Sequence, residues 1–128
     1  KLKPGGQFIA VVMGRFCFWE TIYFLLKLKP AEAFRRLKRG PVNARLDEKT
    51  AIPTWYYSPE DFRTSFARFS LKSVFPIGLW LPPSYLDPFF AKRPGLLRFL
   101  DFMENRWAPS WLARASDHFI ITLVKQKP

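Results

Sequence analysis

The stretch that decides the fold is residues 2–13, which read L-K-P-G-G-Q-F-I-A-V-V-M. Residues 8–13 form an uninterrupted apolar run with several β-branched side chains, which is typical of a strand buried on both faces. Pro4 ends any helix that precedes it, and Gly5 and Gly6 can adopt backbone angles closed to other residues. The stretch therefore predicts a helix exit, a tight turn and a central strand, and such a strand needs neighbours on both sides.

Composition limits what kind of protein this is. The chain has 128 residues, of which 48% are hydrophobic and 18% aromatic, enough for one core. Its net charge of +11 indicates an anionic partner (nucleic acid, an acidic lipid surface or a phosphorylated substrate) or a solvated basic face. Its single cysteine, Cys17, rules out an internal disulfide framework and fits a reducing, cytoplasmic location. We expect no secretory signal and no bilayer-spanning segment, and the first residue suggests a start inside a longer sequence.

Residues 15–55 are expected to form two helices and a loop. Residues 16–26 place Trp19, Ile22, Tyr23 and Leu26 on one helical face, so this helix is buried, caps an apolar pocket or lies in a membrane interface. A second helix is expected over residues 31–39, ended by the Gly-Pro pair at 40–41. The polar residues 43–53 predict a loop. Residues 27–45 hold the densest basic patch, which is either a solvated face or a contact for a phosphate or anionic head group.

The rest of the chain alternates helices and strands. Ser58 is a natural N-cap for a helix that begins at Pro59 and ends near Arg68. Residues 71–81 predict a strand, in which Pro76 and Gly78 imply a bulge or an edge position. Residues 84–116 read as a helical insertion and residues 117–126 as a final buried strand. The order of elements is that of an α/β protein.

Catalytic groupings are scarce in this sequence. No Gly-rich phosphate loop follows a strand, and metal ligands would have to come from Asp117, His118 and distant acids, so we expect no metal site. His118 is the only histidine. It is either a structural residue with satisfied hydrogen bonds or an acid, base or substrate-orienting group at the rim of a site.

The L-K-P-G-G stretch before a buried strand resembles the motif that joins the helix after the fourth strand to the fifth strand in class I S-adenosylmethionine-dependent methyltransferases. Residues 56–62, Y-Y-S-P-E-D-F, resemble that family's entry to the next helix. Residues 71–81 are similar to its sixth strand and residues 117–126 to its seventh, which inserts antiparallel between the fifth and sixth. The resemblance covers the whole chain in outline.

The resemblance implies a fold and an activity. The fold would be α/β, the C-terminal part of a Rossmann-like methyltransferase sheet, with residues 1–128 forming part of one domain. Its activity would be methyl transfer to a small-molecule or lipid-like acceptor. The cofactor, S-adenosylmethionine, would be bound mainly by elements upstream of Lys1, in the N-terminal half of the same domain. This chain alone would then be inactive.

The resemblance also suggests candidate site residues. Ligands in this fold lie beyond the carboxyl ends of the parallel strands. Residues 15–55 exceed the family's usual short connection, and we expect them to form a lid over the acceptor. The expected acceptor contacts are Met13, Gly14, Arg15, Phe16, Trp19, Tyr23, Tyr56 and Tyr57. His118 is the one candidate for a catalytic base.

A second hypothesis is a non-enzymatic basic module that binds an anionic membrane or nucleic acid. The charge and the interleaved aromatic residues favour it. Against this hypothesis, the aromatic residues have core spacing and the arginines are spread over several elements. Nucleic acid is the less favoured of the two partners. An anionic membrane contact is expected through Lys27, Lys29, Arg35, Arg36, Lys38 and Arg39. The protein would then be cytoplasmic and peripheral to the membrane.

Overall fold

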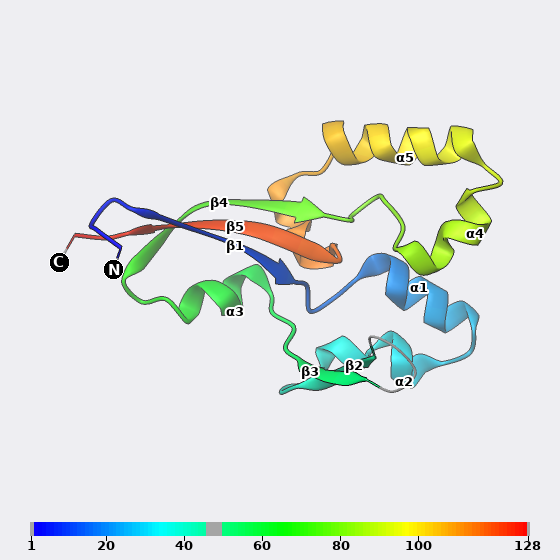
Figure 1. Ribbon diagram of the computed structural model, residues 1–128, viewed down its shortest axis with the longest axis horizontal. Coiled ribbons are helices and arrows are strands. Elements are labelled where there is room, and N and C mark those ends of the chain that lie inside the picture. Colours follow the sequence, from blue (N-terminus) through cyan, green and yellow to red (C-terminus); the bar gives the residue numbers. More distant parts are fainter. Residues whose placement is uncertain (1, 46–49, 128) are drawn as a thin grey trace.

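The computed structural model describes residues 2–45 and 50–127. Three strands form its main sheet: β1 (Gln7–Met13), β4 (Phe69–Ile77) and β5 (His118–Lys125). Their order is β1-β5-β4, and β5 runs antiparallel to both neighbours (Figure 1). The prediction that the last strand inserts antiparallel between the other two is therefore confirmed. Among the described residues the fold is mixed α/β with a small antiparallel sheet.

One face of this sheet carries the core. Phe119, Ile121 and Leu123 of β5 are fully buried there, opposite Val12 of β1 and Val74 of β4. Phe62 and Phe66 cover this face from the segment of helix α3 (Pro59–Thr64), and Ala113 covers it from the 3-10 helix η3 (Ser110–Ala115). Phe66 packs on Phe8 with ring centroids 5.3 Å apart, and aromatic burial of this kind contributes about 2–3 kcal/mol per side chain.

The other face of the sheet is open along β1. Ile9 and Val11 are 62% and 63% exposed, so the expectation that this strand is buried on both faces is wrong for the described residues. Val11 lies opposite Ile120, which lies opposite Phe75, itself 57% exposed. β1 is also the edge of the described sheet, with β5 on one flank only. The apolar composition of β1 is typical of a central strand. The described residues, however, include neither a second neighbouring strand for β1 nor an element that covers its exposed face.

The first turn is formed as expected. Gly5 has a positive φ of 80°, and the Gly6 N–H donates to the Lys3 carbonyl at 2.9 Å. Helix α3 also begins as expected, because the Ser58 hydroxyl accepts the Asp61 N–H at 3.2 Å. It ends at Thr64 rather than near Arg68, because the chain turns at once into β4.

Strand β4 is shorter than the expected range 71–81. It ends at Ile77, because Gly78 takes a positive φ of 66° and turns the chain out of the sheet. Pro76 and Gly78 predict a bulge or an edge position, and β4 is an edge of the described sheet, as predicted. A bulge also exists, but between Leu71 and Ser73 rather than at Pro76. Beyond the strand, both oxygens of Glu104 accept backbone N–H groups of residues 78–81, the shortest being 2.7 Å from Gly78 and Trp80. One carboxylate therefore fixes the exit of β4.

Residues 84–116 are helical, as expected. Their elements are η2 (Ser84–Leu86), α4 (Asp87–Phe90), α5 (Pro94–Arg106) and η3. Figure 1 shows α5 beyond the β4 side of the sheet and α4 beside α1, at the end of the molecule opposite the two termini. No residue of α5 is buried, although it carries an apolar stripe.

Residues 15–55 differ most from expectation. Their elements are α1 (Phe18–Leu26), α2 (Pro30–Ala33), η1 (Arg35–Leu37), β2 (Val42–Arg45) and β3 (Ala51–Thr54). The expected helix over 31–39 breaks at Phe34, and a β2–β3 hairpin replaces much of the expected loop at 43–53, of which 46–49 lie outside the described residues. Helix α1 buries Glu20 and Thr21 and leaves Leu26 80% exposed, the opposite of what its apolar stripe predicts.

Candidate functional site

The candidate site lies where β1 ends and β5 begins. Because the two strands are antiparallel, Met13 lies opposite His118. The Gly14 N–H donates to the Asp117 carbonyl at 2.8 Å, and the Arg15 N–H donates to the Tyr57 carbonyl at 2.9 Å. A Cβ atom at position 14 would lie 2.3 Å from the backbone carbonyl oxygen of Ser116, so only glycine fits at this close approach of the two chain segments. The end of β1 is thus held between residues 57 and 117.

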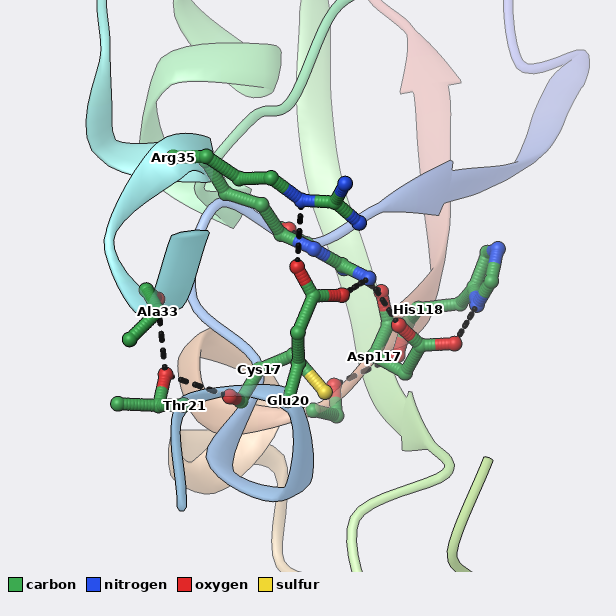
Figure 2. Close-up of polar contacts among 10 residues, drawn as sticks. Cys17, Glu20, Thr21, Ala33, Arg35, Asp117 and His118 are labelled. Atoms are coloured by element: carbon green, nitrogen blue, oxygen red, sulfur yellow. Dashed lines mark hydrogen bonds and ion pairs between the residues drawn. The ribbon is translucent and has the colours of Figure 1, made fainter. Parts of the chain in front are cut away.

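Arg36 is the centre of an ion-pair network at this end. Its guanidinium binds the Glu20 carboxylate and lies 2.8 Å from Oδ1 of Asp117, and its side chain is 12% exposed. It also donates to the Gly14 carbonyl at 3.3 Å. Arg35 adds a second contact to Glu20, with Nε 2.8 Å from Oε1 (Figure 2). Three segments, α1, η1 and the start of β5, therefore meet on one guanidinium.

Burial and charge act against each other at Arg36. Desolvation alone would lower its pKa, but hydrogen bonding to Glu20 and the nearby carboxylates raise the pKa above its already high ordinary value. The guanidinium therefore stays charged at all relevant pH values. A buried pair of this kind adds little net stability but makes the loss of one partner costly.

Asp117 holds the ring of His118. The His118 Nδ1–H donates to Oδ2 of Asp117 at 2.9 Å, while Oδ1 faces Arg36. Burial on its own would raise the pKa of Asp117, but the hydrogen bond from His118 and the charge of Arg36 outweigh it and lower the pKa to about 2. With Nδ1 bonded to a carboxylate, Nε2 is the ring nitrogen left to exchange a proton. The His118 side chain is 33% exposed, so solvent or a substrate can reach it.

Cys17 lies beside this network, at the N-terminus of α1 (Figure 2). It is 2% exposed, and burial raises the pKa of its thiol to about 11. Its carbonyl accepts the Thr21 hydroxyl at 2.8 Å. A buried thiol with a raised pKa is a poor nucleophile at neutral pH, so Cys17 has a packing role.

The structure brings only some of the expected acceptor contacts together. Met13, Gly14 and Tyr57 share backbone contacts, and the Tyr56 ring lies 4.8 Å from the Arg36 guanidinium carbon. The Tyr57 ring, however, points into the core against Phe62. Phe16 is half-buried. These residues border the network rather than line one open hollow.

The remaining expected contacts have other partners. Arg15 forms an ion pair with Asp61 at 2.6 Å, and this carboxylate has a lowered pKa because Ser58 donates to it and Arg15 lies beside it. Trp19 packs against Phe90, and Tyr23 packs against Tyr85 with ring centroids 4.8 Å apart. Nε1 of Trp19 and Nε of Arg15 are buried with no hydrogen-bond partner among the described residues. Their role in acceptor binding stays a prediction.

Glu20, Arg36 and Asp117 are functional candidates that sequence reasoning missed in this role. Glu20 is the only acid within an apolar helical stretch, which was the available indication that it is paired. Arg36 was assigned to the basic patch with its neighbours. Its separation from Asp117 is 81 residues, and no local pattern predicts such a contact.

Fewer basic side chains of residues 27–45 face solvent than the sequence predicts. Arg35 and Arg36 bind Glu20, and Lys29 lies 3.5 Å from the exposed Glu32. Lys27 donates to the Tyr23 hydroxyl, while Lys38 and Arg39 are exposed. Four of the six expected membrane contacts, Lys27, Lys29, Lys38 and Arg39, are therefore exposed. Arg36 is largely buried, and Arg35 is partly exposed but paired with Glu20.

Hollows on the surface lie elsewhere. Two of them, of about 390 and 640 Å³, are lined by residues of β4 and η3, and Trp111 lines both. A third, of about 450 Å³, is lined by Arg68 and Lys125 among others. None of these three is lined by an expected acceptor contact. Within residues 2–45 and 50–127, no helix has the length and apolar character needed to cross a membrane.

Comparison with known proteins adds no assignment, because neither a protein-family model nor a curated protein matches the chain. The function must therefore be argued from the fold and the site.

Replacing Arg36 by Met tests the network. Because this leaves the buried Glu20 without its main partner, we expect the free energy of unfolding in urea to fall by about 3–5 kcal/mol. Arg35→Met is the matched control, since Arg35 is 34% exposed and binds the same carboxylate. It should cost about 1 kcal/mol or less. Glu20→Gln combined with Arg36→Met should recover part of the loss, and equal effects of the two single arginine variants would contradict the central role of Arg36.

Asp117 predicts a pH dependence of stability. Its pKa in the folded protein, about 2, lies below its ordinary value of 3.8, so its stabilising effect is complete above about pH 5 and is lost as the pH falls towards 2. The loss should amount to about 2 kcal/mol. Urea unfolding of the wild type and of Asp117→Asn across this range measures it. The two proteins should converge at low pH, and a constant difference would show that the ionised carboxylate is not the cause.

Proposed function

We propose that this chain is the C-terminal part of an S-adenosylmethionine-dependent methyltransferase domain that acts on a small-molecule or lipid-like acceptor. The observation that carries the proposal is the strand order. An apolar strand after L-K-P-G-G pairs with the last strand of the chain, which lies antiparallel between it and β4. The resemblance implies this order and these directions, and an ordinary antiparallel meander would instead place β4 in the middle.

The open side of β1 supports a larger sheet. Ile9, Val11 and Met13 are 62%, 63% and 40% exposed on one strand face, and the outer edge of β1 has no strand partner among the described residues. Exposed apolar groups along an unpaired strand edge are a marked aggregation hazard. In the proposal, the preceding half of a Rossmann-like domain pairs with this edge and covers this face.

The described residues do not fit the cofactor on their own. The carboxylates at the end of β1 are engaged, Glu20 by two arginines and Asp117 by Arg36 and His118. The three hollows described above lie away from this end. The proposal therefore assigns cofactor binding to residues upstream of Lys1, and assigns to this chain the cover and orientation of the acceptor.

His118 is the group suited to proton transfer. Asp117 fixes its ring through Nδ1, which leaves Nε2 to accept a proton from an acceptor. The ring is next to Met13 at the end of β1, where the acceptor is expected. Arg36 holds Asp117 in turn, so the network positions the base. Among the described residues, no group of three or more His, Cys, Asp or Glu side chains is arranged to hold a metal ion.

Cofactor affinity tests the proposal. Isothermal titration calorimetry with S-adenosylmethionine should give weak or no binding to the 128-residue chain, and clear binding to a protein that also contains the residues before Lys1. Tight binding by the 128 residues alone would contradict the assignment of the cofactor site to upstream residues. No binding by the longer protein would contradict the proposal as a whole.

Substituting His118 tests its role in that longer protein. His118→Gln should lower kcat by about a hundredfold or more for an acceptor that must lose a proton, because the base is removed. The affinity for S-adenosylmethionine should not change, which serves as the control for folding. Asp117→Asn should lower kcat by a smaller factor, since it misorients the ring without removing it. Unchanged kcat in His118→Gln would assign His118 a structural role only.

A further inference from the structure

The turn after α1 exposes two leucines. Leu26 and Leu28 are 80% and 89% exposed, and lysines 27 and 29 alternate with them. We call residues 26–29 the apolar tip. Figure 1 shows that it lies at the end of the molecule opposite both termini, on the same side as the connection between α4 and α5.

Leu28 occupies a position that normally selects glycine. The Lys29 N–H donates to the Phe24 carbonyl at 2.9 Å and the Leu28 N–H donates to the Leu25 carbonyl at 3.0 Å. These two bonds form a Schellman motif, whose C′ residue must adopt a positive φ, and Leu28 has φ 55°. A left-handed conformation costs a residue with a Cβ about 1–2 kcal/mol, and the exposed side chain makes little contact that could offset this. The fold does not require leucine here, which points to an external use of the side chain.

Basic groups and aromatic rings occur on the same end of the molecule as the apolar tip. The Lys27 ammonium lies 4.3 Å from the centre of the Tyr23 ring, which packs on Tyr85. At the α4–α5 connection, which lies on the same side of the molecule in Figure 1, the Arg93 guanidinium carbon lies 3.9 Å from the centre of the Phe89 ring, and Phe89 is 51% exposed. Apolar side chains flanked by lysine, arginine and ring aromatics are the pattern of a surface that enters a lipid interface.

We propose that this end of the molecule docks on an anionic bilayer. Leu26 and Leu28 would enter the boundary between head groups and acyl chains. Lys27, Lys29 and Arg93, with the exposed Lys92 beside it, would bind lipid phosphates. The net charge of +11 attracts the whole molecule to such a surface. Nucleic acid fits less well, because a polyanion offers nothing to two exposed leucines. The docking surface shares Lys27 and Lys29 with the membrane contact expected from the sequence, but it excludes Arg35 and Arg36, which are engaged with Glu20. It does not depend on methyl transfer.

Vesicle binding with one designed variant tests this inference. The wild-type chain should cosediment with phosphatidylcholine vesicles that contain phosphatidylglycerol, more weakly with phosphatidylcholine alone, and less as salt is raised. Leu28→Gly relieves the left-handed strain, so its thermal stability should stay equal or increase, while its vesicle affinity should fall about tenfold because the inserted side chain is lost. If Leu28 had only a structural role, a loss of vesicle affinity in Leu28→Gly would be accompanied by a loss of thermal stability, which we do not expect.

Charge variants supply the matched control. Lys27→Glu should lower affinity for the anionic vesicles about tenfold. Lys72→Glu, at an exposed position of β4, alters net charge equally but should change this affinity much less. Equal effects of the two would overturn the assignment of the docking surface to the apolar tip. Unchanged vesicle affinity in Leu28→Gly would also overturn this assignment. So would a Leu28→Gly variant that differs from the wild type in oligomeric state and not in lipid binding, because the apolar tip would then be a contact between protein chains.

Discussion

The ion pairs of Arg36 are the interaction on which the arrangement of the chain depends. Residues 15–55 leave the sheet after β1, and the chain pairs with β1 again at Tyr57. Among the described residues between these points, the contacts of Arg36 with Glu20, Asp117 and the Gly14 carbonyl tie the segment to the sheet. A charged group so placed gives little net stability, but it tolerates few alternative arrangements, because a wrong packing would leave the buried Glu20 carboxylate and two further polar partners unpaired. It also connects the segment to His118 through a single carboxylate.

Local chemistry made part of this fold predictable. The Pro-Gly-Gly turn, the Ser58 N-cap and the apolar run of β5 each depend on neighbours in sequence, and each is found where the residues indicate. The order of the strands came from the family resemblance, not from periodicity. What the sequence misjudged depends on distant partners: α1 buries Glu20 because Arg36 meets it there, and the helix expected over 31–39 breaks where its arginines turn towards Glu20.

The candidate site was predictable only in its location. Residues after β1 do meet the start of β5, as strand direction requires, and His118 is there. The aromatic residues expected to contact an acceptor mostly pack on other aromatic residues, because stacking partners such as Phe90 and Tyr85 come from the distant helical segment 84–116. The count of positive residues in a stretch also overstated the charge of its surface, because periodicity does not tell which arginines find buried acids.

The contact of Glu104 with the exit of β4 has a consequence for the motions of this chain. The N–H groups of residues 78–81 all point at one carboxylate, which belongs to a helix more than twenty positions along the sequence. Their exchange with solvent deuterium is therefore not a sum of independent local openings. The amides must lose protection as a group whenever α5 lifts that side chain away, so the exchange rate of this turn reports the detachment of the helical insertion from the sheet.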